Sequence, residues 1–122
     1  MFKEKRNYTR TPLQGVDANI YINGKEITAT IKDISETGIA FTIMHYAPIR
    51  AGDIIRFQFL DSVSKEHLVI DGRATVVRTN MEKNCLIIGC RIPLEKNYSN
   101  YVREKEALRF FSEPLRQKFA KK

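Results

Sequence analysis

Two short groups of polar residues have the types and spacing to bind one anionic ligand. Arg6 and Arg10 lie four positions apart. A planar guanidinium can form paired hydrogen bonds with phosphate oxygens or with O6 and N7 of guanine, and it can stack on a base. In the second group, which runs from Asp33 to Gly38, the Asp33 carboxylate can accept hydrogen bonds from two neighbouring donors of a ligand. Ser35 would point to the same face of an extended chain, so one ligand could meet both groups.

Gly38 closes the second group, and either of two properties of glycine suits this place. Glycine tolerates a positive φ at a joint between strands, and its missing side chain lets backbone and ligand approach closely. Without a ligand, residues 33–38 would form an ordinary turn stabilised by an Asp or Ser side chain. Arg6 and Arg10 would then be two solvated charges in a tail. The residues alone leave both alternatives open.

The region from 16 to 93 must position these groups, and its pattern is typical of short β-strands. Apolar residues alternate with polar ones from Val16 to Ile22, and Asn23-Gly24 predicts a tight two-residue hairpin. Further strands are expected at Ile27 to Ile31, Gly38 to Met44, Ile54 to Leu60, His67 to Thr79 with a bend at Asp71-Gly72, and Cys85 to Ile92. Six or seven short antiparallel strands predict a small closed β-barrel, because so small an open sheet could not cover its apolar face.

The two ends of the chain differ from this region. Residues 1–15 lack apolar periodicity and predict a flexible N-terminal arm, whereas a period of about 3.6 after Pro93 predicts a helical segment over 94–122. Ser112 and Pro114 predict a break or kink near Phe111. An apolar stripe is expected to pack on the barrel or to serve as a dimer or partner contact, and it consists of Tyr101, Leu108, Phe111, Leu115 and Phe119. The prediction is thus an all-β fold with a C-terminal helix in a single domain, 1–122, with an arm (1–15), a barrel (16–93) and a helical end (94–122).

Charge and composition limit the class of partner. The formal net charge is +7, and residues 11–94 are neutral overall, so the excess lies at the two ends and indicates an anionic partner. The sequence has neither a secretory signal nor an apolar run long enough to cross a bilayer, which predicts a cytoplasmic protein without membrane insertion. Cys85 and Cys90 fall on opposite faces of one predicted strand, so neither a disulfide nor a metal site is expected.

In combination, the two polar groups resemble the signature of the PilZ family. That signature is an RxxxR motif near the N-terminus, matched by Arg6 to Arg10, followed by a [DN]xSxxG motif, matched by Asp33 to Gly38. With ten arginines in the chain, chance supplies roughly one RxxxR, but the second motif arises by chance in only about one such chain in fifty. The motif order, the predicted barrel and the helical end all agree with the resemblance.

The resemblance implies a receptor for the bacterial second messenger cyclic di-GMP (c-di-GMP), with no further cofactor. The residues that it implies for ligand binding are Arg6, Arg10, Asp33, Ser35 and Gly38. Lys5 stands where many members have an arginine, and Arg91 lies in a late glycine-containing strand, so both are added as candidates. The arm is expected to become ordered on the ligand and to signal to a separate protein, with the receptor a monomer or weak dimer.

Other classes of function fit the sequence less well. Asp33 and Ser35 lack a third residue to activate the serine, and the chain contains no phosphate loop, so an enzyme is not expected. A nucleic-acid-binding barrel could stack bases on Tyr8, Tyr21 and Tyr46, but the neutral strand region argues against it. The remaining alternative is a degenerate PilZ module that binds another protein and no ligand.

Overall fold

The computed structural model describes residues 10–13, 15–44, 47–63 and 66–120 of the 122-residue chain. Within these ranges the chain forms seven strands followed by one helix. They are β1 (Thr11–Pro12), β2 (Asp17–Ile22), β3 (Lys25–Ser35), β4 (Gly38–Ile43), β5 (Ile54–Val63), β6 (Glu66–Glu82), β7 (Cys85–Arg91) and α1 (Lys96–Ala120).

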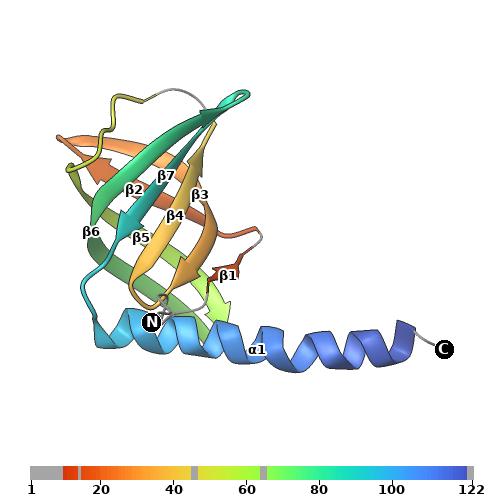
Figure 1. The fold of residues 1–122 in the computed structure, drawn as a ribbon. Helices are drawn as coiled ribbons and strands as arrows, with labels where there is room; N and C mark the ends of the chain where they lie inside the picture. Colours follow the sequence, from red (N-terminus) through yellow and green to blue (C-terminus); the bar gives the residue numbers. More distant parts are fainter. Residues whose placement is uncertain (1–9, 14, 45–46, 64–65, 121–122) are drawn as a thin grey trace, which may run out of the picture.

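Six of the described strands close into an antiparallel barrel (Figure 1). Their order is β3-β2-β5-β6-β7-β4, and β4 pairs back with β3, while β1 adds to the outside of β3. Closure leaves few unpaired strand edges and encloses the apolar face of the sheet. This arrangement confirms the predicted small six- to seven-stranded antiparallel barrel with a C-terminal helix.

Local sequence explains the first hairpin and the packing of the core. Asn23 and Gly24 both have positive φ, at 52° and 78°, as the predicted two-residue turn between β2 and β3 requires. Alternate residues of the strands point inward, and Ile20, Phe57 and Ile88 are completely buried. Cys90 is buried whereas Cys85 is only half-buried, which confirms that they lie on opposite faces of β7, and both are free thiols.

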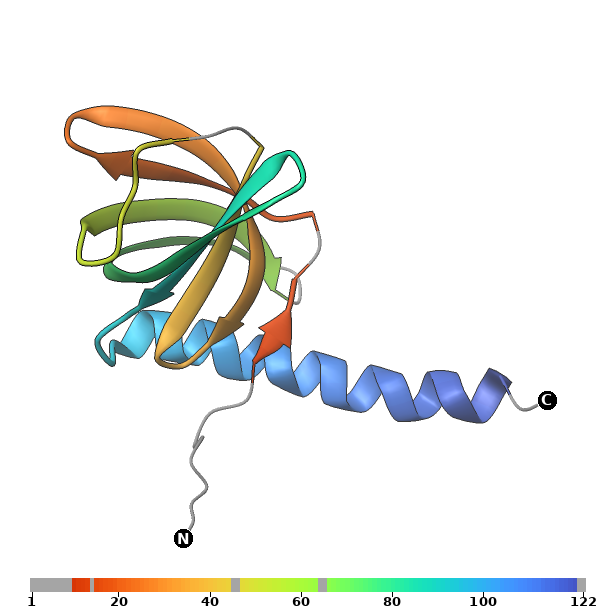
Figure 2. The same cartoon turned by 45° about the horizontal axis from the view of Figure 1, so that its top comes forward.

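Helix α1 covers one end of the barrel with its first turns (Figures 1 and 2). Tyr98, Tyr101 and Val102 are almost completely buried. The Tyr98 ring packs edge-on against Phe57 at 6.3 Å between centroids, and the Tyr101 ring packs against Phe59 at 5.3 Å. Such tilted aromatic pairs are favourable in addition to the apolar area that they bury.

The second half of α1 shows no break, one of the two irregularities that the sequence predicts near Phe111. The helix continues without a break through Ser112 and Pro114 to Ala120, although Pro114 has no amide hydrogen to donate within it. This half projects beyond the barrel (Figure 1), and Leu108 of the predicted stripe is 47% exposed. The side chains of Phe111, Leu115 and Phe119 lie outside the described part. No helix in that part is both long and apolar enough to span a membrane.

The end of the predicted arm is attached to the barrel. Thr11 and Pro12 form β1, which pairs with Ile34 and Asp33 of β3, and the Leu13 amide donates to the Lys32 carbonyl at 3.1 Å. Periodicity could not predict a strand of two residues, because alternation needs a longer stretch. Residues 1–9 of the arm, including their predicted flexibility, lie outside the described part.

At Asp71-Gly72, where the sequence predicts a bend, β6 stays in register with β5, and Gly72 also serves packing. Gly72 pairs in register with Phe57, and a Cβ on Gly72 would lie 3.0 Å from Cζ of the buried Phe57 ring. The irregularity in β6 occurs later, between Val76 and Arg78.

This packing gives a stability prediction. We expect Gly72→Ala to lower the free energy of unfolding by about 1–2 kcal/mol, because the added methyl overpacks against an immobile ring. In a Phe57→Leu background the same change should cost about nothing, and urea denaturation of the four proteins measures both values. An equal cost in the two backgrounds would show that the ring is not the cause.

Candidate functional site

A β-bulge in β3 turns two of the motif residues to the outside of the barrel. Ile31 and Ile34 both point into the core although they are three positions apart, because Lys32 is the extra residue of the bulge. The bulge reverses the alternation of the strand. Asp33 and Ser35 consequently share the outer face, as their spacing predicts.

A second β-bulge lies in β6 and acts in the same way. Val76 pairs with Cys90 and Arg78 pairs with Gly89, so Val77 is the extra residue. Val76 is buried whereas Val77 is 45% exposed. After the bulge, Arg78 lies on the outer face, although it comes two positions after the inward-pointing Val76.

The two bulges mark the ends of one row of paired residues across four strands. Asp33 of β3 pairs with Ala40 of β4, Ala40 with Gly89 of β7, and Gly89 with Arg78 of β6. Three steps between strands put about 14 Å between the Cα atoms of Asp33 and Arg78. Because the two middle residues have a methyl group or no side chain, the row forms a hollow with a floor of backbone and charged walls. Its volume is about 240 Å³, and Lys32 also lines it.

Arg10 lies beside Asp33 at one wall of this hollow. Pairing of β1 with β3 carries the chain past Asp33, and Arg10 Nη1 donates to Asp33 Oδ1 at 2.6 Å. The side chains are 38% and 20% exposed, so the ion pair remains accessible from solvent. A guanidinium and a carboxylate at the rim of one hollow present donors and acceptors together.

Gly38 provides space rather than a special backbone conformation. Its φ is not positive. A Cβ at this position would lie 3.0 Å from the Cys90 carbonyl oxygen, 3.5 Å from Ser35 Oγ and 3.8 Å from Arg10 Nη2. Of the two roles open from the sequence, close approach is therefore the one that the geometry supports, and here the neighbours are protein atoms.

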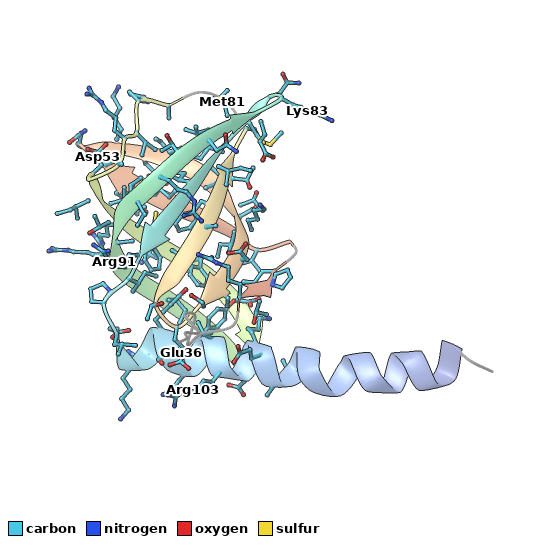
Figure 3. The ribbon with its side chains drawn as sticks, in the orientation of Figure 1. Glu36, Asp53, Met81, Lys83, Arg91 and Arg103 are labelled. Carbon is cyan, nitrogen blue, oxygen red and sulfur yellow. The ribbon has the colours of Figure 1, made fainter. Side chains whose placement is uncertain are left out.

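The structure thus brings four of the seven predicted site residues close together, namely Arg10, Asp33, Ser35 and Gly38. Arg10 and Asp33 line the hollow, whereas Ser35 and Gly38 do not, and Ser35 is only 5% exposed. Arg91 does not line the hollow. It pairs in register with Gly38, but its side chain is exposed and lies beside β6 in Figure 3. Lys5 and Arg6 lie outside the described residues.

Sequence reasoning missed Arg78, which forms the opposite wall. A Cβ on Gly89 would lie 3.5 Å from Arg78 Cγ and 3.7 Å from its Nε, so the arginine lies across the side-chain-free backbone of β7. From this place the exposed guanidinium can stack on a base or contact phosphate. The signal in the sequence was the pair Val76-Val77, where two adjacent apolar residues interrupt the alternation.

The first turns of α1 hold the loop of the second motif (Figure 3). The Tyr98 hydroxyl donates to the Gly38 carbonyl at 2.6 Å, and the Ser99 hydroxyl donates to Glu36 Oε1 at 2.8 Å. Arg103 pairs with Glu36 Oε2 at 3.2 Å. The motif therefore lies between the hollow on one side and the helix on the other.

The buried Tyr98 hydroxyl lies close enough to Arg10 and Asp33 for their charges to act on its pKa. Burial raises the pKa of its phenol, which keeps the hydroxyl protonated as a donor, and the nearby Arg10 charge acts in the opposite direction. The pKa of Glu36 is lowered by the Ser99 hydrogen bond and by the Arg103 guanidinium. Glu36 is thus held as a carboxylate against the helix.

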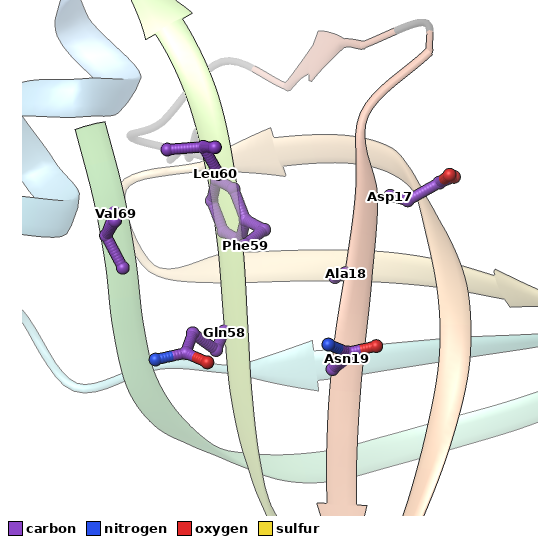
Figure 4. Close-up of a pocket in the computed structure, with 7 residues that line it drawn as sticks. All are labelled: Asp17, Ala18, Asn19, Gln58, Phe59, Leu60 and Val69. Carbon is purple, nitrogen blue, oxygen red and sulfur yellow. The ribbon is translucent and has the colours of Figure 1, made fainter. Parts of the chain in front are cut away.

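Two larger hollows on the barrel are lined by other kinds of residue. One, of about 500 Å³, lies over β2, β5 and β6 (Figure 4), and its lining includes Asp17, Leu60 and Val69 but no basic residue. The other, of about 590 Å³, is mostly apolar and is lined by Met44 and by residues 82–85, so Glu82 borders this hollow as well as the one that contains Asp33. The hollow between Asp33 and Arg78 combines three basic side chains with two acidic ones, which suits an anion that also carries hydrogen-bond donors.

The contact between Glu36 and α1 predicts a pH dependence of stability. Because the folded-state pKa of Glu36 is lowered, its contribution is complete above its ordinary pKa of about 4.5 and is lost as pH falls through the lowered value. We expect Glu36→Gln to cost about 1 kcal/mol of unfolding free energy at pH 7 and clearly less at pH 3. Urea denaturation at both pH values tests this, with the exposed Glu26→Gln as control. A cost that stays constant with pH would contradict the assignment.

Comparison with known proteins places this arrangement in a family. The chain matches the PilZ domain over residues 4–105. A search of curated proteins gave no significant match.

Three solved structures share the fold. The Bacillus subtilis inhibitor of motility (MotI/DgrA) aligns with a TM-score of 0.79 and 16% identity, over 91% of this chain and 54% of that one. YcgR from Escherichia coli in complex with c-di-GMP aligns with a TM-score of 0.68 and 11% identity, over 97% of this chain and 50% of that one. The PilZ domain of E. coli YcgR with c-di-GMP aligns with a TM-score of 0.67 and 14% identity, over 98% of this chain and 99% of that one. The chain spans about half the length of the first two proteins. The chain therefore belongs to the PilZ domain family.

Proposed function

We propose that this protein is a receptor for c-di-GMP and that the hollow between Asp33 and Arg78 is its binding site. The observation that carries the proposal is the Arg10–Asp33 ion pair, which lies at the rim of a hollow whose opposite wall is a third charged group, Arg78. Membership in the PilZ family and likeness to two structures that hold c-di-GMP support the choice of ligand.

The proposed roles follow from the chemistry of each group. The Arg10 guanidinium turns from Asp33 to a phosphate or to the O6 and N7 edge of guanine. The Asp33 carboxylate then accepts from guanine N1 and N2, and Ser35 lies on the same face of β3. Arg78, opposite, stacks on a base or neutralises phosphate, and Lys32 adds positive charge. Lys5 and Arg6 belong to this proposal through the sequence motif alone.

The proposed signal has two parts that start at the same residues. The N-terminal arm joins the barrel at β1, directly after Arg10, so a ligand that draws Arg10 away from Asp33 also moves the arm. On the other side of the motif, Gly38 and Glu36 contact α1. A separate protein would bind to the changed surface.

Isothermal titration calorimetry with c-di-GMP tests the site. We expect saturable binding by the unchanged protein and at least tenfold weaker binding by Arg10→Ala and by Asp33→Ala, because each change removes a charged hydrogen-bonding partner. Matched controls are Arg56→Ala and Asp71→Ala, which break a similar ion pair of 2.9 Å elsewhere on the barrel. These controls should bind as the unchanged protein does.

Competing ligands separate this proposal from its alternatives. GTP and a short single-stranded RNA should bind weakly at physiological salt. RNA binding as tight as c-di-GMP binding would favour a nucleic-acid-binding barrel. A folded protein that binds none of the three would favour a PilZ module without a ligand.

A further inference from the structure

We propose that Glu82 reads the second guanine of the ligand and makes the site selective for guanine over adenine. This inference rests on the proposed function and adds a residue that lies in neither sequence motif. Its basis is that the hollow does not end at the row from Asp33 to Arg78. It continues along the β6–β7 hairpin, where Asn80, Glu82 and Ile87 line it.

The bulge at Val77 is what gives Glu82 this direction. Arg78, Asn80 and Glu82 follow one another at intervals of two after the bulge, so they share the outer face of β6. Without the extra residue these positions would continue the inner face to which Val76 belongs. The bulge therefore sends both the Arg78 wall and the Glu82 carboxylate to the same hollow.

The outer part of the hollow has the character of a nucleobase site. Ile87 pairs with Asn80 and is only half-buried, so it offers an apolar surface on which a planar base can lie. The Asn80 amide donates to Glu82 Oε2 at 3.3 Å, which orients the carboxylate. Glu82 lies four residues beyond Arg78, about 13 Å along the strand, so it is well separated from Asp33. Two acidic groups at distant ends of one hollow correspond to two bases on one ligand.

The charge of Glu82 indicates which base it would recognise. A carboxylate beside a dianionic ligand is unfavourable toward phosphate, so its favourable partner must be a group with hydrogen-bond donors. Guanine presents N1–H and N2–H on one edge, and both can donate to the two oxygens of a carboxylate. Adenine presents an N1 lone pair at the corresponding place, which the carboxylate repels. Glu82 would thus add selectivity as well as affinity.

The test compares Glu82→Gln with the unchanged protein in calorimetric titrations. The probes are c-di-GMP, cyclic di-AMP and cyclic di-IMP, whose base lacks the N2 amino group. We expect the substitution to weaken c-di-GMP binding about tenfold and to reduce the preference for c-di-GMP over both analogues. Glu26→Gln, an exposed change on β3 outside the hollow, should alter neither value.

The outcomes separate this inference from the proposed function. If c-di-GMP binds and Glu82→Gln keeps the affinity and preference of the unchanged protein, the inference is wrong and the proposed function stands. If the unchanged protein does not bind c-di-GMP, the proposed function fails and this inference fails with it. Because Glu82 is exposed at the end of a hairpin, the substitution should leave the melting temperature unchanged, which circular dichroism checks.

Discussion

The proposed site depends on two β-bulges, in β3 and β6, that reverse the alternation of inward-pointing and outward-pointing residues. A closed barrel requires every strand to keep its apolar residues inward, so alternation alone would bury Arg78 if β6 continued from Val76 without an extra residue. Lys32 and Val77 each add one residue, and Asp33 and Arg78 then stand on the outer face at the two ends of one row. Ala40 and Gly89 leave the space between them open.

The residues of this row are connected to the rest of the molecule on both sides of β3. On one side, β1 holds Arg10 against Asp33. On the other, Tyr98 and Arg103 of α1 hold the loop that contains Glu36 and Gly38. These contacts join the hollow, the start of the chain and the helix through a few short hydrogen bonds. A ligand that competes for Arg10 would therefore act on groups that are already coupled.

Much of the fold and part of the site could be predicted from the sequence. Alternation and the Asn23-Gly24 turn identify the strands because side-chain direction in a strand has a fixed period of two. The motif spacing identified Arg10 and Asp33. Arg78 was not predicted, because the Val76-Val77 pair can indicate the bulge but not which strands are neighbours. The continuous helix through Pro114 also escaped prediction, since proline lowers helix stability without preventing a helix.

The most direct test of the proposed site is an amide chemical-shift titration of the ¹⁵N-labelled protein with c-di-GMP. We expect the largest changes at Asp33, Gly38, Gly89 and Arg78, which lie on four adjacent strands, and little change at Asn19 and Leu60 on another face of the barrel. Changes centred on Asn19 and Leu60, or confined to β3 without any at Gly89 and Arg78, would contradict a site formed across the row.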